Sequence, residues 1–165
     1  MRWAWMVGVA VWCGGAAAAR ADAGAVYLLR HGEKVDDSPG ARLSEAGHAR
    51  ARRWAAMLRE VPVTQVFVSD VERTQQTAAP LVADRAVPRT VVAAEASVRE
   101  LPRRMAQLKP TDVAVVFSHS NILPSLWSAL GCRTPITVAD GDYDRVMLII
   151  PRKGMEPSCQ ALRVD

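Results

Sequence analysis

Two histidines in this sequence directly follow apolar runs, and each stands among polar residues. His31 comes after Arg30 at the end of AVYLLR, and His119 lies in the stretch SHSN that follows VAVVF. A third polar stretch, SDVER, follows VFV and ends in Arg73. One histidine at such a place is usually a satisfied loop residue. Two histidines with two arginines at equivalent places indicate a functional site.

These residue types suit the binding and transfer of a phosphoryl group. The planar fork of a guanidinium matches two phosphate oxygens at once. A neutral imidazole is a competent nucleophile near neutral pH, because its ordinary pKa is about 6.5. Phosphoryl transfer needs mainly positioning and neutralisation of charge, so we expect no cofactor.

Short apolar runs alternate with helical patterns after residue 23. The predicted strands are 25–30, 66–69, 90–94, 113–118 and 145–150, with a further edge strand at 159–164. The predicted helices are 45–61, 73–85, part of 96–108 and 122–131. Ser44 is placed to cap the first helix, Pro102 makes the boundary of the third uncertain, and Gly131 suits the position after the last.

This alternation predicts an α/β fold, a three-layer sandwich in which helices cover both faces of a mostly parallel central sheet of about five to six strands. Carboxyl ends of parallel strands meet at one edge of a sheet, where ligands bind. The three polar stretches should therefore lie together at one rim. No repeat or interdomain linker divides the chain of 165 residues, so we expect one domain over 24–165.

Residues 1–23 have the pattern of a secretory signal peptide. Arg2 supplies a positive start, residues 3–19 carry no charge, and the segment closes in Ala-Asp-Ala. An uncleaved membrane anchor is the rival interpretation, because the uncharged run has about the minimum length for a span. Its Gly- and Ala-rich composition and cleavage-like end favour removal after Ala23. We expect a secreted or periplasmic protein with no membrane contact after cleavage.

The charge of the mature domain is compatible with an anionic substrate. Without residues 1–23 the chain has 19 basic and 16 acidic side chains, a net charge of +3. Such a mild excess is far from the charge typical of nucleic-acid binding, so no nucleic-acid partner is expected.

Two cysteines, Cys132 and Cys159, remain after removal of the leader. In an exported domain they are able to form one disulfide, but the sequence leaves their pairing open. Neither stands in a CxxC pair or near a metal-ligand cluster, and a catalytic thiol is less favoured.

The segment YLLRHGEK resembles the R-H-G signature of the histidine phosphatase (phosphoglycerate mutase-like) superfamily. The likeness continues in the family's order through RLSEAGHARA (42–51), SDVERTQQTA (69–78) and SHSN (118–121), over essentially the whole mature chain. The resemblance implies a metal-independent phosphatase that hydrolyses phosphate monoesters or phosphohistidine. It also implies a covalent phosphohistidine intermediate on His31.

The resemblance assigns roles to the other motif residues. Arg30, Arg73 and His119 would form the rest of the phosphate pocket around the nucleophile. Gly32 would permit close approach of the backbone to the substrate, and Asn121 would support the loop.

The general acid that protonates the leaving oxygen is harder to place. Glu100 ranks first, because it follows Arg73 at about the family's usual distance. The alternatives are Glu95, Asp140, Asp142 and Asp144. Some short family members resemble this chain in lacking a clear donor, which suits good leaving groups such as phosphohistidine.

The insertions that cap the site in larger relatives are missing, and only 36–41 and 95–110 are placed to cover the pocket. An open pocket suits a phosphorylated small molecule, an envelope glycolipid or a phosphoprotein. A non-catalytic phosphate-binding module is the alternative function. A metal hydrolase is less favoured because HEXXH and similar ligand spacings are absent, and no G-x-S-x-G elbow indicates a serine hydrolase.

Overall fold

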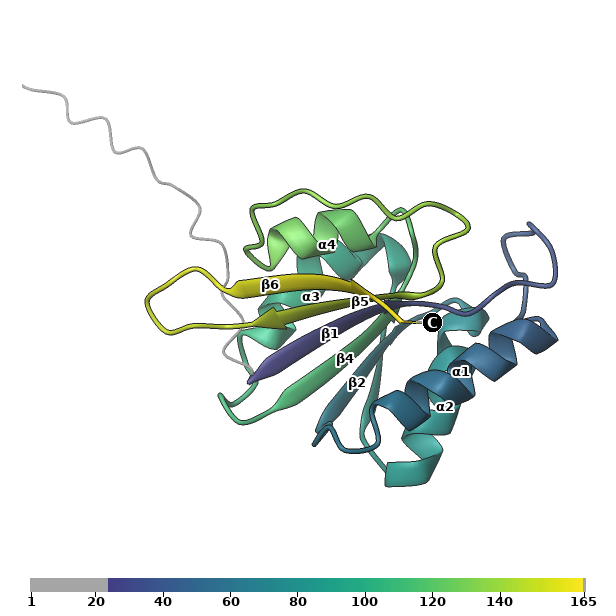
Figure 1. Cartoon of the computed structure of the whole chain (residues 1–165), viewed down its shortest axis with the longest axis horizontal. Coiled ribbons are helices and arrows are strands. Elements are labelled where there is room, and N and C mark those ends of the chain that lie inside the picture. The colour runs from purple at the N-terminus through teal and green to yellow at the C-terminus, as the bar shows by residue number, and fades with distance from the viewer. Residues whose placement is uncertain (1–23, 165) are drawn as a thin grey trace, which may run out of the picture.

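The computed structural model describes residues 24–164, which form a central β-sheet with helices on both faces (Figure 1). The strands are β1 (Ala25–Arg30), β2 (Gln65–Ser69), β3 (Arg89–Val92), β4 (Val113–Ser118), β5 (Arg145–Ile150) and β6 (Ser158–Arg163). The helices are α1 (Glu45–Met57), α2 (Glu72–Arg85), α3 (Ser97–Met105) and α4 (Leu123–Ala129), with a 3-10 helix η1 (Ala94–Ala96) before α3. The predicted signal peptide, residues 1–23, lies outside the described residues.

The six strands are ordered β3-β2-β4-β1-β5-β6 across the sheet. The first four are parallel to one another, whereas β5 runs antiparallel to β1 and β6 antiparallel to β5. The predicted α/β fold with a mostly parallel sheet of five to six strands is therefore confirmed. The expected edge strand near the C-terminus forms β6.

Two apolar clusters hold the three layers together, because successive side chains of a strand point to opposite faces. One cluster joins β1 and β4 to α1 and α2 through Leu29, Phe117, Trp54 and Leu81. The other joins the same strands to α3 and α4 through Leu28, Val116, Met105 and Trp127. β1 and β4, at the centre of the sheet, thus contribute to both clusters.

Local signals set the ends of the helices. The Gly47 N–H donates to Ser44 Oγ at 3.2 Å, so Ser44 caps α1 as predicted. The helix ends at Met57, earlier than the sequence pattern predicts. Gly131 follows α4 with a φ of 95°, the left-handed conformation expected after a helix C-terminus. Pro102 lies inside α3, where it removes one backbone donor without ending the helix.

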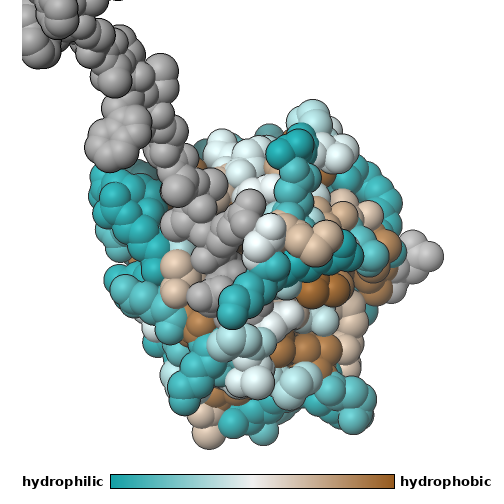
Figure 2. All heavy atoms as spheres, turned by 90° about the vertical axis from the view of Figure 1, so that its left-hand side faces the viewer, coloured by the Kyte–Doolittle hydropathy of each residue, from teal (hydrophilic) through white to brown (hydrophobic). Residues whose placement is uncertain are grey.

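The surface carries only scattered large apolar side chains in the described part of the chain. On the face shown in Figure 2, hydrophobic groups lie in small clusters between hydrophilic ones. Over the whole described surface, the exposed large apolar residues are Val35, Val91, Ile150, Met155 and Leu162. None of the helices in residues 24–164 has the length and apolar character needed to cross a bilayer.

Cys132 and Cys159, whose pairing the sequence left open, form a disulfide. Their Cα atoms are 5.9 Å apart, within the usual range for such a bond. Cys132 follows α4 and Cys159 lies on β6, so the bond ties the end of a helix to the antiparallel edge of the sheet. The segment 133–144, which leads into β5, lies between the two cysteines in the chain.

Loss of this disulfide is expected to lower the free energy of unfolding by about 3 to 4 kcal/mol, because the unfolded chain regains the entropy of a loop of this length. Urea unfolding with and without a reductant measures the change. The Cys132→Ser/Cys159→Ser double variant is the control and should not respond to the reductant. A loss below about 1 kcal/mol in the wild-type protein would contradict the prediction.

Candidate active site

The parallel arrangement of β2, β4 and β1 brings the predicted site residues to one edge of the sheet. Arg30 is the last residue of β1 and pairs with Ser118, the last residue of β4. A histidine directly follows each of these two strands, and the His31 N–H donates to the Ser118 carbonyl at 3.0 Å. As a result the rings of His31 and His119 meet edge to face, with their centroids 5.2 Å apart.

His31 is buried, with 3% of its surface exposed, and one hydrogen bond defines its tautomer. Its Nδ1 lies 2.7 Å from the Gly32 carbonyl oxygen. A carbonyl only accepts, so Nδ1 carries the proton and Nε2 keeps a free lone pair. Burial lowers the pKa of His31 to about 3; the Gly32 bond opposes this effect, and the positive side chains nearby add to it. His31 is therefore a neutral imidazole at pH 7.

His119 is held by a chain of hydrogen bonds from β2 and α2. Its Nδ1 lies 3.4 Å from Arg73 Nη2, and its Nε2 lies 2.9 Å from Ser69 Oγ. An arginine only donates, so Nδ1 accepts and Nε2–H donates to Ser69. Ser69 Oγ in turn lies 2.9 Å from the buried Thr74 Oγ1. Burial, and next the Arg73 charge, lower the pKa of His119 to about 4, so this ring is also neutral.

The two arginines supply the fixed positive charge of the site. Arg30 is 2% exposed, and its Nη1 donates to the Ala139 and Asp140 carbonyls at 2.8 and 2.7 Å. Arg73 lies in the first turn of α2, and its Nη1 donates to the Pro39 carbonyl at 2.9 Å. The Nε atoms of both arginines are buried and lack a partner among the described residues. Burial and the nearby Arg30 charge lower the pKa of Arg73. Such a group of donors favours an anion.

Two glycines allow α1 to approach the R-H-G segment closely. A Cβ on Gly32 would lie 2.7 Å from the Gly47 carbonyl oxygen, and a Cβ on Gly47 would collide with the Glu33 backbone. The Gly32 N–H donates to Thr77 Oγ1 on α2 at 3.0 Å. α1 and α2 therefore both contact the backbone beside His31, and the glycines are required by contact between backbones.

Tyr143 belongs to this cluster but was not predicted from the sequence. The Arg30 Cζ lies 4.1 Å from the centre of the Tyr143 ring, and the ring centroids of Tyr143 and His31 are 6.1 Å apart. Tyr143 precedes β5, which is antiparallel to β1. The start of β5 therefore lies at the same edge as the end of β1, and an antiparallel assignment of 145–150 would have placed ADGDYD at the site.

The acidic candidates differ in what they contact. Asp140 Oδ1 lies 3.4 Å from Arg30 Nη2 and accepts from Ser120 Oγ at 3.0 Å, so this carboxylate touches the site. Asp142 and Asp144 are engaged with other arginines at the β5–β6 edge.

The remaining predicted residues make no hydrogen bond or ion pair with this cluster in the part of the chain that the structure describes. Glu100 on α3 forms ion pairs with Arg99 and Arg104 at 3.7 and 3.6 Å. Glu95 is an exposed residue of η1, and Asn121 is exposed in the turn before α4. The donor role of Glu100 and the supporting role of Asn121 remain predictions.

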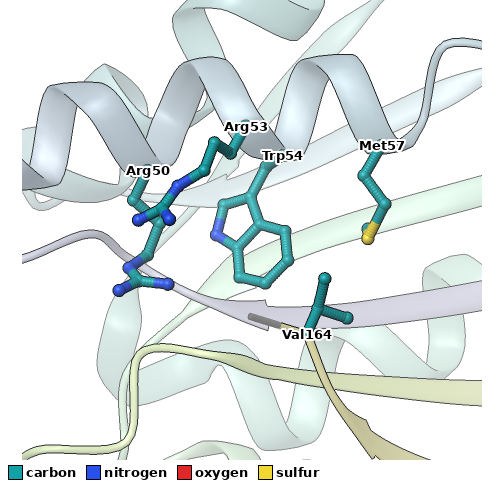
Figure 3. Close-up of a pocket in the computed structure, with 5 residues that line it drawn as sticks. All are labelled: Arg50, Arg53, Trp54, Met57 and Val164. Carbon is teal, nitrogen blue, oxygen red and sulfur yellow. The ribbon is translucent and has the colours of Figure 1, made fainter.

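A separate hollow lies between α1 and the end of β6 (Figure 3). Its lining consists of Arg50, Arg53, Trp54, Met57 and Val164. Arg50 connects it to the histidine site, since its guanidinium also binds Glu33 Oε1 at 2.6 and 2.8 Å. Within residues 24–164, no group of three or more His, Cys, Asp or Glu side chains is arranged to hold a metal ion.

Comparisons with known proteins agree with this geometry. Residues 26–102 match the family profile of the histidine phosphatase superfamily (branch 1). The alpha-ribazole phosphatase of Shigella flexneri is similar to this chain with a TM-score of 0.70 and 16% identity, over 85% of this chain and 96% of its own. The mycobacterial glucosyl-3-phosphoglycerate phosphatase gives a TM-score of 0.68 and 13% identity, over 86% and 99%.

A protein of Agrobacterium tumefaciens assigned as the phosphohistidine phosphatase SixA gives a TM-score of 0.59 and 19% identity, over 86% of this chain and 98% of its own. A search of curated protein sequences gave no match. The fold is thus that of a three-layer α/β protein with its polar cluster at the carboxyl ends of parallel strands. Residues 26–102 thus carry the profile of the histidine phosphatase superfamily, and the fold of the described residues agrees with that match.

Because His31 and His119 are buried and neutral, we expect mild acid to lower the stability of the folded protein. Below the ordinary histidine pKa of 6.5 the unfolded chain takes up protons on His31 and His119, whereas the folded protein takes them up only near pH 3 and pH 4. The unfolded state then binds more protons, so the free energy of unfolding should fall between pH 6.5 and pH 5. This window lies above the usual range of the carboxylates.

Urea unfolding at several pH values between 7 and 5 measures this dependence. The His31→Asn/His119→Gln double variant should show a shallower slope, and the exposed His48→Gln on α1 should keep the wild-type slope. A double variant with the wild-type slope would show that other groups cause the acid sensitivity.

Proposed function

We propose that the mature protein is a metal-independent phosphatase that acts through a covalent phosphohistidine on His31. The state of His31 supports this most directly. The Gly32 carbonyl holds its Nδ1 proton, which leaves the Nε2 lone pair free. Its pKa is lowered to about 3, by burial and in part by the charges of Arg73 and Arg30. A buried, neutral imidazole in a positively charged pocket is suited to attack phosphorus.

The reaction consists of two displacements at phosphorus. The Nε2 lone pair forms a P–N bond as the bond from phosphorus to the leaving group breaks, and the leaving atom takes a proton from a carboxyl group or from solvent water. A second water then attacks phosphorus and gives up a proton to the solvent, the P–N bond breaks, and its electron pair returns to Nε2. Arg30, Arg73 and His119 bind the phosphoryl oxygens and stabilise the charge that builds on them. Gly32 lets α1 pack against the backbone beside His31, and the proposal assigns to Asn121 the support of the loop after β4.

The positions of the candidate proton donors favour substrates whose leaving groups need little protonation. Glu100, the first-ranked donor, has a side chain that is 37% exposed and paired with arginines, and that of Asp140 is 93% exposed. Neither carboxyl is enclosed together with the two histidines, so neither is held in place to protonate a leaving atom there. We therefore expect phosphohistidine and aryl phosphates to react faster than alkyl phosphates. Phosphohistidine is also the substrate class given in the name of one structural neighbour.

The open surroundings of the site support a phosphate carried on a larger molecule. The loop 36–41 reaches Arg73 through the Pro39 carbonyl, and its side chains from Asp36 to Gly40 are exposed. The proposed substrates are a phosphoprotein, an envelope glycolipid or a phosphorylated small molecule. The proposal includes no cofactor and no nucleic-acid partner.

Turnover and trapping of the intermediate test the activity. Protein comprising residues 24–165 should hydrolyse an aryl phosphate and a phosphohistidine peptide faster than a sugar phosphate. His31→Ala should lower the rate by about three orders of magnitude or more while the protein stays folded, because the attacking atom is lost. The matched control is His48→Ala, at an exposed position on α1, which should keep the wild-type rate.

Rapid quenching without acid followed by mass spectrometry should locate phosphate on His31. Full activity of folded His31→Ala, or phosphate on another residue, would overturn the mechanism. Phosphate binding without any turnover by the folded wild-type protein would instead identify the alternative, a non-catalytic binding module.

We also propose that residues 1–23 direct export and are removed, so that the protein works in the periplasm or outside the cell. The leader pattern supports this, and so does the Cys132–Cys159 disulfide, a bond typical of oxidising compartments. Intact-mass analysis of protein recovered outside the cytoplasm should give Gly24 as the first residue. Retention of Met1 in that material would contradict the proposal.

A further inference from the structure

Tyr143 lies where several charged groups of the site converge. Its ring lies under the Arg30 guanidinium, with the Arg30 Cζ 4.1 Å from the ring centroid, and the Arg50 Cζ lies 6.0 Å from the same centroid. Arg50 is itself fixed by Glu33, two residues after His31. Tyr143 thus connects the arginine that ends β1 with the ion pair on α1.

The backbone around Tyr143 is braced before any substrate binds. Asp142 accepts hydrogen bonds from the Ala139 N–H at 3.1 Å, from Arg145 Nε at 3.3 Å and from Arg163 Nη2 at 2.8 Å. The Ala139 carbonyl, on the other side of that residue, accepts from Arg30 Nη1. β5 and β6 therefore hold the segment 139–143 against the Arg30 side chain.

The two backbone carbonyls that bind Arg30 do not fix the tilt of its guanidinium plane. A guanidinium donates only in its own plane, so the tilt of that plane decides where its remaining N–H groups point. The carbonyls of Ala139 and Asp140 both bind Nη1, at one corner of the plane, and Nη2 has only a long contact of 3.4 Å to the exposed Asp140 carboxylate among the described residues. They do not prevent rotation of the plane about that corner. The Tyr143 ring face, stacked at 4.1 Å, prevents that rotation. The stack thereby also sets the direction of the Arg30 Nε–H, which has no partner among residues 24–164.

We propose that Tyr143 is a positioning residue that sets the plane of the Arg30 guanidinium for the bound phosphoryl group. The inference rests on the proposed phosphatase function of the same site. Tyr143 acts through the face of its ring, which attracts the cation, so its hydroxyl is not required. The ring lies outside the sequence motifs and is contributed by the loop that precedes the antiparallel strand β5.

Two substitutions separate the ring from the hydroxyl. Tyr143→Leu should lower kcat/KM by about five- to thirtyfold, the range expected for the loss of a partly buried cation–π contact. The inhibition constant of inorganic phosphate should rise with it. Tyr143→Phe keeps the stacked ring and should stay within about twofold of wild type in both measurements. Tyr27→Leu, at the other tyrosine of the chain, is the matched control and should leave both unchanged.

A double-variant cycle shows whether Tyr143 works through Arg30. In an Arg30→Ala background, Tyr143→Leu should cause no further loss, because the guanidinium that it positions is gone. Equal effects of Tyr143→Leu with and without Arg30 would overturn the inference. So would wild-type phosphate inhibition in folded Tyr143→Leu.

Calorimetric binding of inorganic phosphate separates failure of this inference from failure of the proposed function. If the wild-type protein binds phosphate without turnover, the phosphatase proposal fails. Weaker phosphate binding by Tyr143→Leu, restored by Tyr143→Phe, would still support the positioning role. Unchanged phosphate binding by Tyr143→Leu would contradict it whether or not the enzyme turns over.

Discussion

The site depends on one structural constraint, the parallel register of β1 against β4. Arg30 pairs with Ser118, and the His31 N–H continues the ladder by donating to the Ser118 carbonyl. This register brings His31 and His119, far apart in sequence, to a centroid distance of 5.2 Å. A slip of one residue would turn each side chain to the opposite face of the sheet. The register is protected because every residue of β4, from Val113 to Ser118, is buried.

Burial has opposite consequences for the two kinds of basic side chain at this edge. An imidazole is able to lose its proton, so burial lowers the pKa of both histidines and leaves them neutral. A guanidinium keeps its charge in proteins, so a buried arginine must find acceptors instead. Arg30 finds them in the segment 139–140, and Arg73 in the Pro39 carbonyl. The same loss of water thus yields neutral imidazoles and a fixed positive charge next to each other.

The sequence could predict the parts of the site that depend on parallel strands. Apolar runs that end in Arg30-His31 and Ser118-His119, together with the rule that carboxyl ends of parallel strands share an edge, were enough to bring these residues together. Tyr143 and the contact of Asp140 with Arg30 could not be found in that way. They depend on the direction of β5, and the apolar run RVMLII has the same pattern in either direction. The pairing of Cys132 with Cys159 could not be predicted from the sequence either, because it requires β6 to pair beside β5.

The antiparallel pair β5–β6 also explains how the segment 133–144 comes to cover the buried Arg30 at the edge of the sheet. A strand that runs against β1 begins where β1 ends, so the loop before it necessarily lies at the rim of the site. Asp142 and Asp144 in this loop are paired with Arg163 of β6, and the disulfide ties β6 to the end of α4, where the loop departs. The loop is therefore anchored at both ends and at its middle. Such anchoring lets backbone carbonyls of Ala139 and Asp140 hold a buried arginine, a task that a freely moving loop could perform only with a large loss of entropy.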